Sequence, residues 1–92
     1  MSYQLIQDSI REAVNQYERD EISLPVVVQR LERIVDLAQD HGHPSAPELD
    51  YVWGELEIIN AVILDEGTST KRDFQDIRRL MERFVELSSL GE

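Results

Sequence analysis

The residues best suited to metal chemistry lie in one short segment, where Asp40 is followed by His41-Gly42-His43. Two imidazoles and a carboxylate are ligands that zinc or nickel accepts. The segment has no third neutral ligand at a suitable spacing, and the chain contains no cysteine that could supply a thiolate. We therefore predict no bound metal and no other cofactor.

Residue patterns of catalytic sites are not found in the sequence. There is no Gly-rich phosphate loop, no nucleophile elbow and no HExxH motif, and serine and histidine do not recur at a spacing that suggests a triad. Carboxylate pairs are numerous, but no apolar residues are placed to raise the pKa of only one partner. We do not expect the chain to be an enzyme.

Length and composition indicate a single ordered domain over residues 1–92. Hydrophobic residues make up 41% of the chain, and it contains only four glycines and three prolines. No apolar run approaches the roughly 20 residues that a membrane span needs, and no signal peptide is visible. We therefore expect a cytoplasmic protein without a membrane partner. The net charge of −10 also argues against direct binding of nucleic acid, because it repels phosphate.

Hydrophobic periodicity predicts four helices and no strand. The first covers about residues 3–19, and the second opens at Ser23 and is stopped by Gly42 and Pro44. The third begins with a capping box of Ser45 and Glu48 and continues to about residue 65. The fourth begins at Thr70 with a similar box. Phe74, Ile77, Leu80, Met81, Phe84 and Leu87 are predicted to form its core face.

The loops between these helices are short, about 4–7 residues, so consecutive helices should pack antiparallel. The predicted fold class is all-α, a compact antiparallel four-helix bundle.

The third helix carries more apolar residues than one buried face requires. Its core stripe should contain Leu49, Val52, Trp53, Leu56, Ile59, Ile63 and Leu64, with Asn60 among them. On the opposite side Tyr51, Ile58 and Val62 form a second stripe, and Gly54 and Ala61 flank it, which would let another backbone approach closely. Either neighbouring helices cover both sides of this helix, or the second stripe is a docking face for a partner or a second copy, or its members are scattered surface apolar residues without a function.

The excess of negative charge lies in residues 1–66, which carry 4 basic and 14 acidic side chains. Residues 67–92 carry equal numbers of basic and acidic side chains. This distribution is either an ordinary solvated surface or a field that attracts a basic protein. The carboxylates concerned include Glu32, Asp36 and Asp40 of the second helix and Glu48, Asp50 and Glu55 of the third. We expect Arg72, Arg79 and Arg83, which share one side of the fourth helix, to pair with nearby carboxylates rather than bind phosphate.

The stretch from His43-Pro44-Ser45 through Glu48-Leu49 to Tyr51 resembles the colicin-type nuclease immunity proteins. These are small, acidic four-helix proteins that inhibit the DNase or RNase domain of a bacterial toxin. In that family a His-Pro-Ser turn leads into a short third helix with an acidic residue and two adjacent tyrosines before a proline. The resemblance makes Glu48 the acidic residue and Tyr51 the first tyrosine.

The likeness covers about ten residues, and the chain departs from the family pattern directly after it. Val52 stands at the second tyrosine and Trp53 at the proline, and the third helix here is much longer. In the family, shared contacts come from the third helix and specificity contacts from the second.

The sequence therefore predicts a small acidic immunity or inhibitor protein that binds and neutralises a basic toxin, with a nuclease as the first candidate. The alternative is a homodimeric helical scaffold or regulatory interaction module. The predicted partner-binding residues are Tyr51, Ile58, Val62, Glu48, Asp50, Glu55, Glu32, Asp36 and Asp40.

Overall fold

The computed structural model describes residues 3–89 and has the predicted all-α architecture. Its helices are α1 (Tyr3–Glu18), α2 (Leu24–Asp40), α3 (Ala46–Glu66) and α4 (Lys71–Ser88). Each lies within a few residues of the segment that hydrophobic periodicity predicts. Gly91, near the predicted end of the fourth helix, lies outside the described residues.

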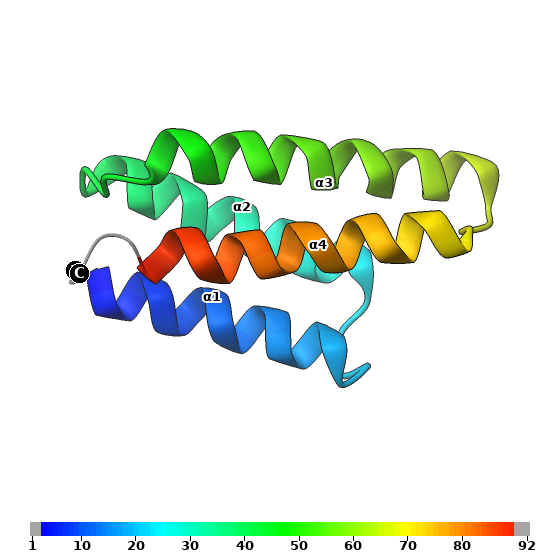
Figure 1. Ribbon diagram of the computed structural model, residues 1–92, viewed down its shortest axis with the longest axis horizontal. Coiled ribbons are helices and arrows are strands. Elements are labelled where there is room, and N and C mark those ends of the chain that lie inside the picture. Colours follow the sequence, from blue (N-terminus) through cyan, green and yellow to red (C-terminus); the bar gives the residue numbers. More distant parts are fainter. Residues whose placement is uncertain (1–2, 90–92) are drawn as a thin grey trace.

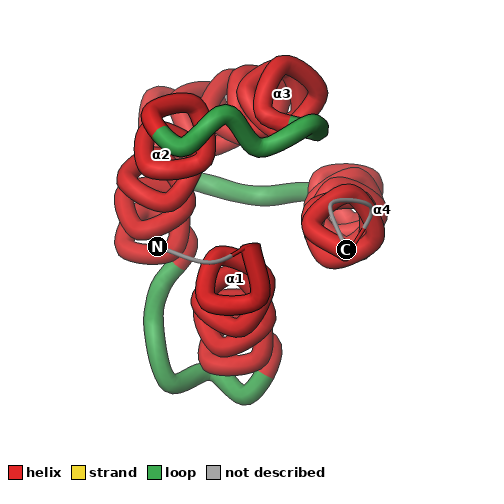
Figure 2. Tube along the Cα trace, turned by 90° about the vertical axis from the view of Figure 1, so that its left-hand side faces the viewer, coloured by secondary structure: helices red, strands yellow, loops and turns green. Residues whose placement is uncertain are grey.

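Consecutive helices run antiparallel, so that α1 begins and α4 ends at the same end of the bundle (Figure 1). Each helix packs against the next one in the chain, and α4 returns to pack against α1. The end-on view in Figure 2 shows the four helices arranged around a common centre. Among the described helices, α3 packs only against α2 and α4, so one long side of it has no neighbouring helix there.

The core is built from apolar residues at helical spacing on all four helices. Its largest fully buried side chains include Ile6 and Ile10 of α1, Leu31 of α2 and Phe84 of α4. The core residues of α3 are Ala46, Leu49, Val52 and Leu56, with Trp53, Ile59 and Ile63 packed beside them.

Trp53 lies partly in this core, and its indole Nε1–H donates a hydrogen bond of 2.9 Å to the Val28 carbonyl. This bond ties α3 to α2 and satisfies the polar group that burial of a tryptophan requires. Asn60, which the sequence placed on the core stripe, is buried, but its Oδ1 accepts no hydrogen bond among the described residues.

The helix caps differ in how closely they follow the predictions. The capping box of α4 is confirmed, since Asp73 N–H donates to Thr70 Oγ1 at 3.1 Å and Thr70 N–H donates to the Asp73 carboxylate at 2.8 Å. The box predicted for Ser45 and Glu48 is wrong. Ser45 has φ −96° and ψ 7° rather than extended backbone, and its side chain caps nothing. Ser23 also precedes its helix without a side-chain bond.

Two residues that the periodicity assigned to the core are exposed instead, Leu64 at 63% and Phe74 at 56%. Figure 1 shows the reason, because the turn between α3 and α4 projects beyond the turn between α1 and α2. Side chains in this projecting part have fewer helices to pack against. Gly67 ends α3 with φ 71°, the left-handed conformation that favours glycine there.

Within residues 3–89, no helix combines the length and the apolar character that crossing a lipid bilayer requires.

Candidate functional site

The second apolar stripe of α3 lies on the side of the helix that has no neighbour, and we call it the outer face of α3. It consists of Tyr51, Ile58 and Val62, whose side chains are 70%, 66% and 44% exposed. The interpretation that neighbouring helices cover both sides of α3 is therefore wrong. Large apolar side chains gathered on one exposed helix face are typical of surfaces that bind another molecule.

Gly54 lies beside Tyr51 and Ile58 on this side of α3, and within residues 3–89 the space next to its Cα is open. A Cβ built at Gly54 would meet no atom within 4 Å outside the local helix backbone. The close packing that the sequence suggested at this glycine does not occur among the described residues. The exposed neighbour Ala61 continues the small, open surface along the helix.

Next to Tyr51, α3 and α4 enclose a groove of about 570 Å³, which we call the α3–α4 groove. Its apolar lining includes Tyr51 and Val52 of α3 and Leu80 and Leu87 of α4. Charged groups stand around them. The complete lining is Pro47, Glu48, Tyr51, Val52, Glu55, Arg79, Leu80, Glu82, Arg83, Glu86 and Leu87. Three of the predicted binding residues, Glu48, Tyr51 and Glu55, thus meet at one groove.

Tyr51 and Glu55 are one helical turn apart on α3. As a hydrogen-bond acceptor and as a negative charge, the Glu55 carboxylate raises the pKa of the Tyr51 phenol above its ordinary value of 10.0. The phenol is therefore neutral at physiological pH, and its ring presents an apolar surface with a polar end.

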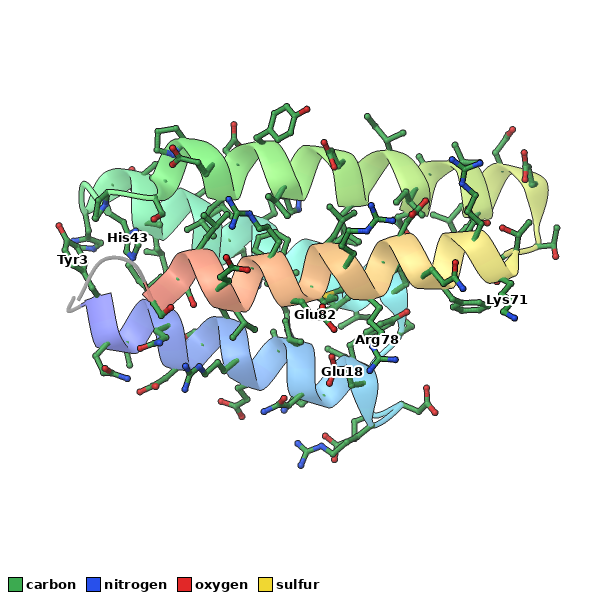
Figure 3. All side chains as sticks on the ribbon, in the orientation of Figure 1. Tyr3, Glu18, His43, Lys71, Arg78 and Glu82 are labelled. Atoms are coloured by element: carbon green, nitrogen blue, oxygen red, sulfur yellow. The ribbon has the colours of Figure 1, made fainter. Side chains whose placement is uncertain are left out.

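The arginines on the α4 side of the groove are paired within α4. Arg79 contacts Asp76 and Arg83 contacts Glu86, each at 2.9 Å, as the sequence analysis expected. Arg78 pairs with Glu82 at 3.5 Å, and Figure 3 shows this pair beside Glu18 of α1.

Arg72 has no ion pair within the described part of the chain. On α3, which has six carboxylates and no basic side chain, Glu48 and Glu55 have no ion pair in residues 3–89. The uncompensated charge at the groove is therefore negative.

The other predicted acidic residues are exposed but lie outside this groove. Asp50 is on α3, and Glu32, Asp36 and Asp40 are on α2. The structure thus separates the predicted site into two parts, a contiguous region on α3 and a set of carboxylates on α2 that adds to the general negative field.

The histidine segment is not arranged as a metal site. His43 is 3% exposed, and its Nδ1 accepts a hydrogen bond of 3.0 Å from the Ser45 N–H. Its ring lies 4.9 Å from that of Tyr3, as Figure 3 shows at one end of the bundle. His43 therefore packs the α2–α3 turn against the start of α1. Within residues 3–89 no three His, Cys, Asp or Glu side chains come together to hold a metal ion.

The sequence analysis missed the α4 contribution to the groove. It assigned Leu80 and Leu87 to the core, where Leu87 is buried and Leu80 is half-buried, but it did not indicate that both also line the groove. It considered Arg83 only as an ion-pairing residue. The spacing of Leu80, Arg83 and Leu87 does place them on one flank of a helix. Only the packing of α4 against α3 brings that flank beside Tyr51.

No protein-family model matches the chain, and comparisons with curated proteins and with solved structures find no significant match. We therefore infer function from the surface chemistry of α3 and its neighbour α4.

Proposed function

We propose that this protein is a small acidic inhibitor of the immunity type, which binds and neutralises a basic toxin. The observation that carries the proposal is the outer face of α3, an exposed apolar stripe on a helix that carries six carboxylates and no base. Aromatic and aliphatic anchors within a charged rim are a common form of protein interface. Tyr51 and Ile58 would be the principal anchors.

The overall charge supports a basic partner. A net charge of −10 on 92 residues attracts a positively charged protein and accelerates their encounter. Nucleases expose basic surface because they bind phosphate, so the first candidate is the nuclease domain of a toxin. The short resemblance from His43 to Tyr51 extends the proposal to a bacterial toxin that is neutralised in the cytoplasm.

Self-association through the same face is the alternative, because an apolar stripe can also bind its own copy. Two facing α3 helices would bring together six carboxylates from each chain, and α3 has no basic side chain to offset them. Like charges at an interface oppose association. This electrostatic cost supports the inhibitor proposal over the homodimer.

The experiment begins with capture of the native partner by the tagged full-length chain and its identification by mass spectrometry. The purified partner is then assayed for cleavage of DNA and RNA, with and without the chain. We expect a basic partner whose nuclease activity falls to background at an equimolar ratio. A partner whose activity the chain leaves unchanged would contradict the proposal.

Two matched variants locate the interaction. Ile58→Lys and Leu37→Lys each replace an exposed apolar side chain with a lysine, on α3 and α2 respectively. Ile58→Lys should abolish inhibition, whereas Leu37→Lys should retain it. Sedimentation of the free chain tests the alternative directly, since a tight, salt-insensitive dimer would support the scaffold instead.

A further inference from the structure

The α3–α4 groove extends over a defined length. Its lining runs from Pro47 to Glu55 on α3 and from Arg79 to Leu87 on α4. At roughly 1.5 Å per helical residue, each wall is about 12 Å long, or a little more than two turns. The groove thus matches two or three apolar side chains at i, i+3 or i+4 and i+7 of another helix.

The walls of the groove determine the kind of backbone that can occupy it. Both walls are α-helices, whose backbone N–H and C=O groups are bonded within the helix except at the ends. The groove therefore offers side chains and no strand edge. An occupant must satisfy its own backbone hydrogen bonds, which favours a helix over an extended segment.

The charges around the groove determine the sign of the charge that an occupant should carry. On α4, Arg79 and Arg83 are already paired with acidic residues of the same helix. On α3, Glu48 and Glu55 stand on either side of Tyr51 without an ion pair among residues 3–89. A lysine or arginine next to the apolar side chains of the occupant would lie near these two carboxylates. It could also stack over the Tyr51 ring.

A second copy of this chain does not supply such an occupant. Among its helices only α4 has more basic than acidic residues, and the apolar face of α4 is buried in its own core. The groove is also continuous with the outer face of α3 through Tyr51, which lines the groove and belongs to that face.

We propose that the α3–α4 groove binds a basic amphipathic helix, with its apolar side chains against Tyr51 and Leu80, over the buried Val52 and Leu87, and a lysine or arginine beside Glu48 and Glu55. The inference rests on the proposed function, because it takes this helix to be part of the basic partner. It assigns the groove as the site that recognises the pattern of the partner's residues, in addition to its charge.

The test uses a synthetic peptide of about four helical turns, with leucines at i, i+3, i+4 and i+7 and lysines elsewhere. A peptide of identical composition in scrambled order has the same charge but no apolar face. At physiological ionic strength the patterned peptide should bind and gain helicity by circular dichroism. It should shift amide resonances of residues 48–55 and 79–87. Equal binding of the scrambled peptide would overturn the inference.

Matched variants separate the groove from the general negative field. Glu48→Gln/Glu55→Gln and Glu32→Gln/Asp36→Asn remove the same charge from exposed helix positions, inside and outside the groove. The first pair should weaken binding of the patterned peptide about fivefold or more, and the second should weaken it about twofold or less. Tyr51→Ala should weaken it about tenfold. Equal losses in both pairs would show diffuse attraction and overturn the inference.

Failure of this inference is distinguishable from failure of the proposed function. If the peptide does not bind but Ile58→Lys still abolishes inhibition of the captured toxin, the groove assignment is wrong and the inhibitor role stands. If the patterned peptide binds specifically but no captured partner is inhibited, the groove assignment stands and the inhibitor role is wrong.

Discussion

At the scale of single residues, we expect Tyr51 to contribute much to binding and little to the stability of the fold. Its side chain is 70% exposed, so Tyr51→Ala should change the free energy of unfolding by less than about 0.5 kcal/mol. As an interface anchor the same change should cost about 2 kcal/mol or more of binding free energy. Urea denaturation and the dissociation rate of the complex measure the two effects. An unchanged dissociation rate would remove Tyr51 from the site.

Tyr17 provides a pH-dependent prediction at the same scale. Its burial, and then the negative charge of Asp20, raises the pKa of Tyr17 above its ordinary value of 10.0. The unfolded chain then loses this proton at lower pH than the folded chain. The contribution of Tyr17 to the free energy of unfolding is therefore complete below about pH 10. It is lost as the pH rises through the pKa of Tyr17 in the folded chain.

Tyr17→Phe cannot ionise, so its unfolding free energy should fall less steeply above about pH 10 than that of the wild type. Chemical denaturation at a series of alkaline pH values gives both curves. Parallel curves throughout this range would contradict the account of Tyr17.

How far sequence could predict the site is clearest from particular residues. Helical spacing alone places Tyr51, Ile58 and Val62 opposite Leu49 and Leu56, and the structure has this arrangement. It does not reveal that Leu80 and Leu87 line the same groove as Tyr51, because their position depends on how far α4 is rotated about its own axis. Pairwise packing of helices sets this rotation, and it leaves no periodic signal in one sequence.

At the scale of the helices, the start of α4 is tested by its cap. Thr70→Ala removes the hydroxyl that accepts the Asp73 N–H, and it should cost about 1 kcal/mol of stability. Ser23→Ala is the matched control, because Ser23 also precedes a helix but forms no side-chain cap bond. That change should cost no more than a few tenths of a kcal/mol. Urea denaturation of both variants measures these costs. Equal losses of stability in the two variants would argue against the capping box.

Gly54 makes a prediction for α3 itself. Glycine within a helix is less favourable than alanine by roughly 0.5–1 kcal/mol. A Cβ at this position would meet no neighbour, so Gly54→Ala should stabilise the free chain by about that amount. The thermal midpoint and urea midpoint should both rise. A lower midpoint would mean that another part of the chain approaches Gly54 closely.

The elements also show where sequence reasoning reached its limit. The ends of α3 follow from Pro47 near its start and Gly67 after its end, whose residue types favour these positions. The exposure of Leu64 and Phe74 could not be predicted in the same way. Periodicity records which face of a helix is apolar, but it does not record how far the neighbouring helices extend along it.

At the scale of the whole molecule, charge and shape act together. The bundle leaves the outer face of α3 and the α3–α4 groove accessible within a surface of strong negative charge. Under the proposed function, the charge should accelerate the encounter with a basic protein, and the apolar surface should determine how long the complex lasts. Raising the salt concentration should therefore slow association more than it speeds dissociation.

Cross-saturation in nuclear magnetic resonance, from the unlabelled partner to the isotope-labelled chain, maps the contact surface most directly. The account predicts that signal loss in the native complex is concentrated at Tyr51, Ile58 and Val62 and along the two walls of the α3–α4 groove. Loss concentrated on the exposed sides of α1 or α2, with α3 unaffected, would contradict it.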